Sequence, residues 1–229
     1  MPARASRPLR CCGVAAVVAL AAAASGCGSA TVAELPPPSA PRDAPPLTTT
    51  PAGRALALRS ASRELADRLI PPASRIPVDD GGRFAVVRPR ERVAELFDAQ
   101  GGLLGRADAG VGPTRGLSND RWLWVVDTQG DALLVFRVRP KLELVRRVFL
   151  PGGPYAIALD TRRLRLWVTL TGTNEVVELP ANGRPSELRR FPTVRQPDAV
   201  AVDSSAHRVF VGGRRELQLL DPGPLPPRG

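Results

Sequence analysis

The stretch "LWVTLTGTNEVVEL", Leu166 to Leu179, repeats one that begins 43 residues earlier, "LWVVDTQGDALLVF", Leu123 to Phe136. The two align without a gap, and each contains two apolar segments separated by a short polar turn. Recurrence at a period of about 20 to 50 residues indicates a repeat fold, in which each unit buries its faces against its neighbours. Trp124 and Trp167 occupy equivalent positions, so we predict that both are core residues between units.

Four prolines mark the start of four units: Pro71, Pro113, Pro154 and Pro197, spaced by 42, 41 and 43 residues. Each of the first three is followed by four short segments, separated by turns rich in Gly, Asn and Asp. The first two segments are the most apolar and the last is the most polar, as in a propeller blade whose outer strand faces water. We therefore predict an all-β, β-propeller-like fold of about four blades, each with four antiparallel strands.

The fourth unit lacks a closing strand, because the chain continues after Asp221 as "PGPLPPRG". Residues Arg63 to Ile70 resemble the end of the second unit, so they could supply the outer strand of the last blade and hide its edge. The same residues also match a short amphipathic helix, and both interpretations stay open. Four units could close into a ring, or could form an open arc that pairs with a second copy as a homodimer.

The start of the chain has the features of a bacterial export signal. Residues 1–10 are basic, residues 11–24 are apolar, and "ASGC" ends at Cys27. This resembles the lipobox of bacterial lipoproteins, although Ala24 stands where Leu is commoner. The resemblance implies that residues 1–26 are removed, that Cys27 is acylated, and that the protein is anchored to membrane lipid at the outer face of the cell membrane.

We expect residues 27–53 to be a disordered, Pro-rich linker, residues 54–222 to be the propeller-like domain, and residues 223–229 to be a disordered tail. The net charge is +10, and the only lysine is Lys141. Such a surface could attract anionic lipid or an anionic envelope polymer, or it could be merely solvated. A protein partner is equally compatible, whereas nothing in the sequence indicates nucleic-acid binding.

The units containing "GGPYAIALD" and "LWVTLTGTNEVVEL" resemble the NHL/YVTN class of β-propeller repeats, and look most like its YncE-like and streptogramin-lyase-like branches. The resemblance covers Pro71 to Asp221. It implies a propeller architecture but specifies no activity. These families usually build six or seven blades, whereas this chain has sequence for four.

Two enzymatic activities of related propellers can be weighed against the residues present. Streptogramin lyases use several histidines and a divalent metal, but this chain has only His207, in the turn "SSAHRVF". Calcium-dependent lactonases use a cluster of Glu, Asn and Asp, for which the candidates are Asn119, Asp127, Asn174 and Asp198. Asx residues at such turn positions usually shape the backbone. We therefore predict no metal and no cofactor.

If the domain binds a ligand, the resemblance places the site at the propeller axis, at the positions just after the anchor prolines. These are Arg115, Tyr155 and Asp198, a mixed rim that suits a polar or anionic group. We expect a non-enzymatic binding or scaffolding module. The alternative is a propeller enzyme, a lyase-like or lactonase-like hydrolase.

Overall fold

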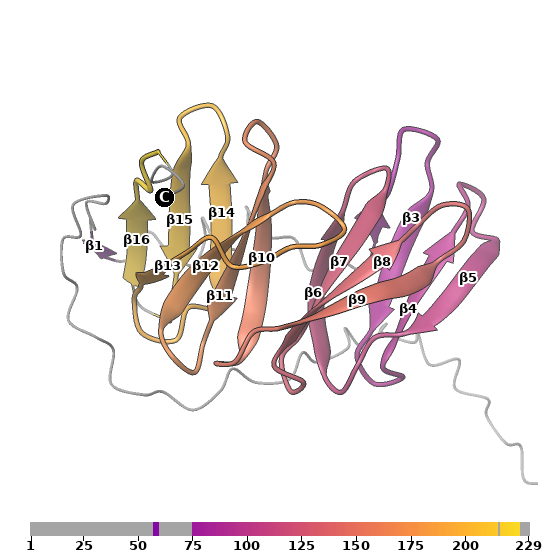
Figure 1. Cartoon of the computed structure of the whole chain (residues 1–229), viewed down its shortest axis with the longest axis horizontal. Helices are drawn as coiled ribbons and strands as arrows, with labels where there is room; N and C mark the ends of the chain where they lie inside the picture. The colour runs from indigo at the N-terminus through magenta and orange to yellow at the C-terminus, as the bar shows by residue number, and fades with distance from the viewer. Residues whose placement is uncertain (1–56, 60–74, 215, 225–229) are drawn as a thin grey trace, which may run out of the picture. The chain divides into compact units, whose positions relative to one another are not determined.

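Figure 1 shows the computed structural model, which describes residues 57–59, 75–214 and 216–224. All of them belong to one of the two units into which the chain divides, Ala33–Gly229. The described residues form strands, turns and loops and contain no helix, so none of them belongs to a helix that could cross a membrane. The strands make four antiparallel sheets of four, which confirms the predicted all-β propeller-like fold.

The strands follow one another in the order expected of propeller blades. The first sheet contains β2 to β5, the second β6 to β9 and the third β10 to β13, each in chain order; the fourth has the order β1-β16-β15-β14. The bounds are β1 (Ala57–Arg59), β2 (Ile76–Pro77), β3 (Phe84–Arg88), β4 (Val93–Phe97), β5 (Leu103–Asp108), β6 (Pro113–Ser118), β7 (Trp122–Asp127), β8 (Ala132–Arg137), β9 (Glu143–Phe149), β10 (Pro154–Asp160), β11 (Arg165–Leu170), β12 (Glu175–Pro180), β13 (Arg189–Pro192), β14 (Ala199–Asp203), β15 (Arg208–Gly212) and β16 (Glu216–Leu220).

The repeated stretch forms the central hairpin of the second and third sheets. β7 pairs with β8 in the same register in which β11 pairs with β12, so that Leu123 faces Phe136 and Leu166 faces Leu179. The polar residues between the two strands of each hairpin form its turn. Trp124 and Trp167 are buried in the two successive cores between sheets, as predicted.

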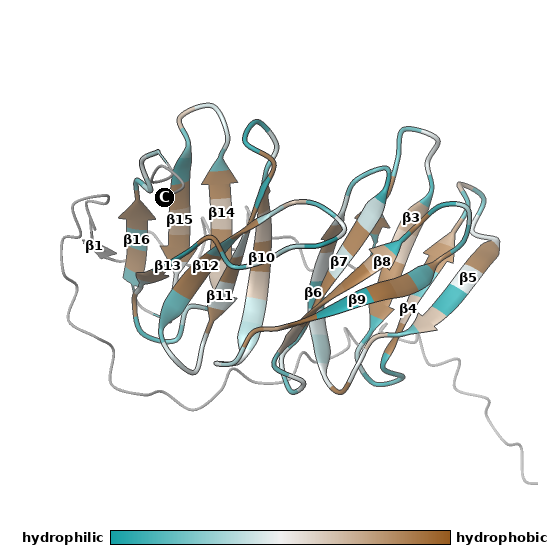
Figure 2. Ribbon diagram, in the orientation of Figure 1, coloured by the Kyte–Doolittle hydropathy of each residue, from teal (hydrophilic) through white to brown (hydrophobic). Residues whose placement is uncertain are grey.

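Neighbouring sheets pack through their first strands, with β2 against β6, β6 against β10 and β10 against β14. Figure 2 shows hydrophobic residues along the strands and hydrophilic residues mainly in the connecting turns. The outer strands β5 and β9 are largely exposed, as expected for blade edges. Among the described strands, none of the packed pairs joins the fourth sheet to the first.

The middle sheets are buried on both faces and the end sheets mainly on one. In β8 and β12 nearly every residue is buried. In the first sheet, by contrast, Phe84 and Phe97 stack at 5.1 Å on the face away from the second sheet and stay partly exposed. Phe210 and Leu219 are paired and partly exposed on the corresponding far face of the fourth sheet. Two end faces therefore carry apolar side chains that no neighbouring sheet covers in the described part of the chain.

The outer strand of the fourth sheet comes from the start of the chain, but from residues other than those predicted. β1 pairs antiparallel with β16, so that Leu58 faces Leu217. The predicted segment, Arg63 to Ile70, lies outside the described residues, as do residues 1–53 with Cys27. The sequence pointed to the wrong segment because a three-residue strand is too short to show a period in its side chains.

Candidate functional site

The three predicted axial residues lie where the innermost strands begin. Arg115 and Tyr155 are among the first residues of β6 and β10, and Asp198 directly precedes β14. The strand pairing is irregular near Arg115 and Tyr155. Its register shifts between Pro113 and Arg115 in β6, and again after Pro154 in β10. Such bulges redirect side chains at the rim of a sheet.

The structure brings Arg115 and Tyr155 together across two sheets. The Arg115 guanidinium carbon lies 5.7 Å from the centre of the Tyr155 ring, within the range of a cation–π contact. The backbone around them is fixed by buried hydroxyls: Thr114 Oγ1 donates to the Tyr155 carbonyl at 3.2 Å, and Thr128 Oγ1 donates to the Pro154 carbonyl at 2.6 Å. The pair is therefore held in place before any ligand arrives.

The electrostatics of the cluster include Asp198. Burial raises the pKa of the Tyr155 phenol, the positive charge of Arg115 works against this rise, and the negative charge of Asp198 adds to it. The phenol stays protonated at neutral pH, so it can donate a hydrogen bond but cannot act as a base. A cation, a neutral donor and an anion within one cluster suit a polar or zwitterionic group.

The other lactonase-type candidates are engaged in turns. Asp127 is fully buried and accepts hydrogen bonds from the backbone N–H groups of Val111, Gly112 and Gly130. Asn119 accepts from two backbone N–H groups within its own turn. The Asn174 side chain accepts from the backbone N–H of Gln196, in the loop that precedes β14. Of the described residues, no group of three or more His, Cys, Asp and Glu could hold a metal ion.

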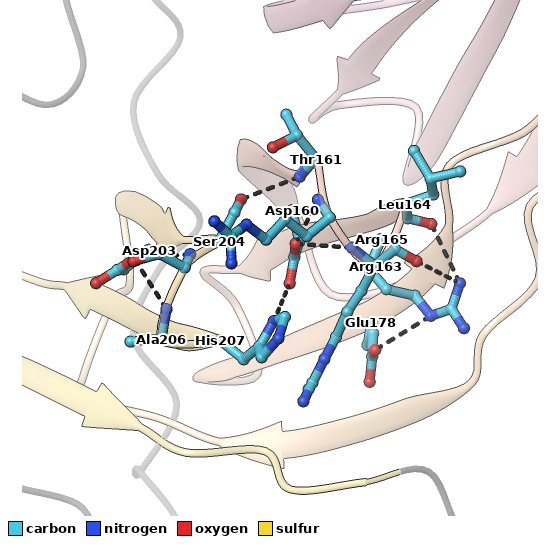
Figure 3. A network of polar contacts seen from close by, with 12 residues as sticks. Asp160, Thr161, Arg163, Leu164, Arg165, Glu178, Asp203, Ser204, Ala206 and His207 are labelled. Carbon is cyan, nitrogen blue, oxygen red and sulfur yellow. Dashed lines mark hydrogen bonds and ion pairs between the residues drawn. The ribbon is translucent and has the colours of Figure 1, made fainter.

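His207 lies in the turn between β14 and β15 with a positive φ of 56°. Its Nδ1 is 3.5 Å from Asp160 Oδ2, and Asp160 also accepts from the backbone N–H groups of Arg162 and Arg163. Figure 3 shows a second link between these turns, in which the Thr161 N–H donates to Ser204 Oγ. The histidine thus belongs to a network that joins turns of the third and fourth sheets.

A buried ion cluster was not predicted from the sequence. Glu178, on β12, is 2% exposed and lies between Arg165 at 3.4 Å and Arg189 at 2.6 Å; Figure 3 shows the first of these contacts. Arg189 also donates to the carbonyl groups of Pro222 and Pro224. The only sequence signal was a glutamate within the apolar strand "EVVEL", and its partners become evident only from the strand register.

Comparison with known proteins supports the fold and does not specify a function. No family model matches the chain, and no curated protein matches it. Solved β-propeller structures do match: hydrazine synthase from Kuenenia stuttgartiensis has a TM-score of 0.57 at 16% identity, over 64% of this chain and 45% of that one. Virginiamycin B lyase from Staphylococcus aureus, solved with quinupristin, has a TM-score of 0.51 at 16% identity, over 63% and 50%. A putative 6-phosphogluconolactonase from Bacteroides fragilis has a TM-score of 0.53 at 14% identity, over 61% and 47%.

These identities establish the β-propeller architecture alone. The chain spans about half the length of the structures that it matches. The neighbours include enzymes of different activities, so the shared fold assigns none of those activities to this chain.

Proposed function

We propose that this protein is an exported lipoprotein, anchored through acylated Cys27 at the outer face of the cell membrane, whose propeller is a module that binds another protein. The observation that carries the binding role is the cluster of Arg115, Tyr155 and Asp198, drawn from three successive repeat units. Repeat folds commonly place ligand contacts on such a shared face, because equivalent positions of successive units lie side by side. A buried aromatic next to an arginine is also typical of the residues that dominate protein interfaces.

The anchoring part of the proposal rests on the basic, apolar and "ASGC" segments that end at Cys27. A diacylated cysteine carries two acyl chains, which suffice for stable anchoring. Replacing Cys27 with Ala in the producing cell should move the protein from the membrane fraction to the soluble fraction and abolish incorporation of labelled palmitate. Cys12→Ala is the matched control, because that cysteine would be lost with the signal. Retention of the Cys27→Ala protein in the membrane would disprove the anchor.

Photo-crosslinking in intact cells tests the binding role. Tyr155 is replaced by p-benzoylphenylalanine, and the control carries the same substitution at Leu164, which is 57% exposed in the turn between β10 and β11. We expect a discrete, protease-sensitive adduct from the Tyr155 position alone. An adduct that resists protease would identify an envelope polymer instead of a protein. Equal labelling from both positions would mean that the cluster is no binding site.

We also propose that a second copy of the chain covers the two end faces. Both faces carry partly exposed aromatic rings, Phe84 with Phe97 on one sheet and Phe210 on the other. Exposed apolar faces of this kind are typical of interfaces. Light scattering of the purified Cys27→Ala chain should give the mass of a dimer, and Phe210→Arg should give that of a monomer. A monomer without the second substitution, at micromolar concentration, would contradict the pairing.

A further inference from the structure

A cavity of about 510 Å³ lies away from the axial cluster, between the outer part of the second sheet and a loop of the third. Three of its lining residues are arginines, one is a tryptophan and none is acidic. The lining residues are Trp122, Arg137, Val145, Arg146, Asn182, Gly183 and Arg184.

The positive charge of this cavity arises where the second repeat differs in sequence from the first and the third. In the third sheet Arg189 on β13 faces Glu178 on β12, and in the first sheet Arg106 on β5 faces Glu95 on β4. Both arginines form ion pairs with the facing glutamate, at 2.6 and 3.9 Å. In the second sheet the corresponding arginine, Arg146, faces Val135. The second sheet therefore keeps the arginine and lacks its carboxylate.

The contacts of the other arginines do not remove the excess positive charge of the cavity. Arg137 donates to Glu143, which lies outside the cavity wall, and this hydrogen bond holds the pKa of Glu143 below its usual value. Neither Arg146 nor Arg184 forms an ion pair with an acid in the described part of the chain. Guanidinium groups in this arrangement favour an oxyanion, which they can bind through two parallel hydrogen bonds.

An aromatic surface lies beside these charges. Trp122 is half-buried, and the Arg121 guanidinium carbon lies 5.4 Å from its ring centre. Gly183 lies against the six-membered part of the indole so closely that a Cβ at this position would collide with it. A half-buried indole next to an anion site offers an apolar surface to the ring of a ligand that carries the anion.

The loop that carries Gly183 and Arg184 is held in a fixed conformation. The Trp124 indole N–H donates to the Asn182 carbonyl at 3.1 Å, and the Asn182 side chain accepts from the Arg184 N–H at 2.8 Å. The Ala181 N–H donates to the carbonyl of Leu164 at 2.9 Å. A preorganised wall lowers the entropy cost of binding.

A second cavity has the same number of arginines but differs in how they are paired. It is about 300 Å³ in volume and also contains three arginines, Arg163, Arg165 and Arg189. There Glu178 pairs with two of them, and the third donates to the carbonyl of Gly223. In that cavity every arginine already has a hydrogen-bonding or ionic partner, so Arg163 serves as the control.

We propose that the cavity at Trp122 and Arg146 binds a phosphorylated sugar, with the phosphate on the arginines and the sugar ring on the indole. The site uses neither the axial cluster nor the lipid anchor, so it stands or falls independently of the function proposed above.

Calorimetry on the full chain, solubilised in an uncharged polyoxyethylene detergent, tests this with glucose 6-phosphate, glucose and inorganic phosphate. Glucose 6-phosphate should bind at least about tenfold more tightly than either of the others. Arg146→Met and Arg184→Met should each weaken it by about tenfold or more, whereas Arg163→Met should have no effect. All three side chains reach the surface, and circular dichroism verifies that the variants are folded.

Two further variants separate the parts of the proposal. Glu143→Gln should tighten phosphate binding severalfold, because it releases Arg137 from its partner. Trp122→Leu should weaken glucose 6-phosphate more than inorganic phosphate, because only the sugar uses the ring.

Several results would overturn the proposal. If glucose 6-phosphate binds no more tightly than glucose, or if Arg163→Met weakens its binding as much as Arg146→Met does, the cavity is no phosphate site. If inorganic phosphate binds as tightly as the sugar phosphate, the ring plays no part. If only micelles containing phosphatidylglycerol bind, and Arg146→Met abolishes this, the ligand is a lipid headgroup and the sugar is refuted.

Discussion

Removal of the Asp127 carboxylate distinguishes a turn-shaping residue from a metal ligand. Asp127 is fully buried, and its carboxylate accepts from the N–H groups of Gly112 at 2.7 Å and of Val111 and Gly130 at 3.1 Å. Its Oδ2 also lies 3.4 Å from Arg147. Asp127→Ala leaves these donors without their acceptor.

The loss in stability follows from how far each donor is buried. Gly112 is buried, so its unpaired N–H costs about 2 to 3 kcal/mol, whereas the N–H groups of the exposed Val111 and the partly buried Gly130 recover water and cost about 0.5 to 1 kcal/mol each. The free energy of unfolding should fall by about 3 to 5 kcal/mol, a large part of the stability of a typical domain. Asp203→Ala is the control. Asp203 accepts from the N–H groups of Ser205 and Ala206 in an exposed turn, where water replaces it, and should lose only about 0.5 to 1 kcal/mol.

Urea unfolding followed by tryptophan fluorescence measures both losses, since the chain has three tryptophans, all within the sheets. The dependence of the unfolding free energy on urea should be unchanged in both variants. The measurement is repeated with EDTA. If chelation destabilises the unsubstituted chain as much as Asp127→Ala does, the carboxylate is a metal ligand. If Asp127→Ala loses no more than Asp203→Ala, the hydrogen-bond reasoning fails.

Two further predictions concern titrating groups. Tyr155 is the only tyrosine, so ultraviolet absorbance follows its ionisation alone; Arg115→Met should raise its pKa further and Asp198→Asn should lower it, and a titration unchanged in both variants would show that the three groups do not form a cluster. The Arg83 side chain donates to Asp79 and lowers the pKa of that carboxyl, so the pair stabilises the fold above the unfolded pKa of Asp79 and loses this effect as pH falls through the folded value. Asp79→Asn should therefore flatten the acid limb of the curve of stability against pH, and an unaltered limb would rule out this contribution.

The repeat itself could be predicted from the sequence, because strand and turn segments recur wherever the chain must stack like units. The register of the central hairpins, the burial of Trp124 and Trp167 and the exposure of β9 all follow from that pattern. The closing strand β1 did not follow, because its pairing with β16 depends on contacts between residues about 160 positions apart. Arg115 and Tyr155 were expected at the axis only by analogy with propellers, and the contact between them was not predicted, because no spacing in the chain itself shows it.

The same pattern explains why the cavity at Trp122 could not be found from the sequence. The two aligned stretches show that the second repeat has Val135 at the position where the third has Glu178. The effect of this difference depends on which residue of the outer strand faces the position. The bulge in β9, between the partners of Val135 and Phe136, shifts the register and so changes which residue that is. A repeat constrains the positions that every unit shares, which are the core positions. Specific binding then arises at positions where one unit differs in sequence from the others. The chemical effect of such a difference can be predicted only when the facing residue, here Arg146, is known.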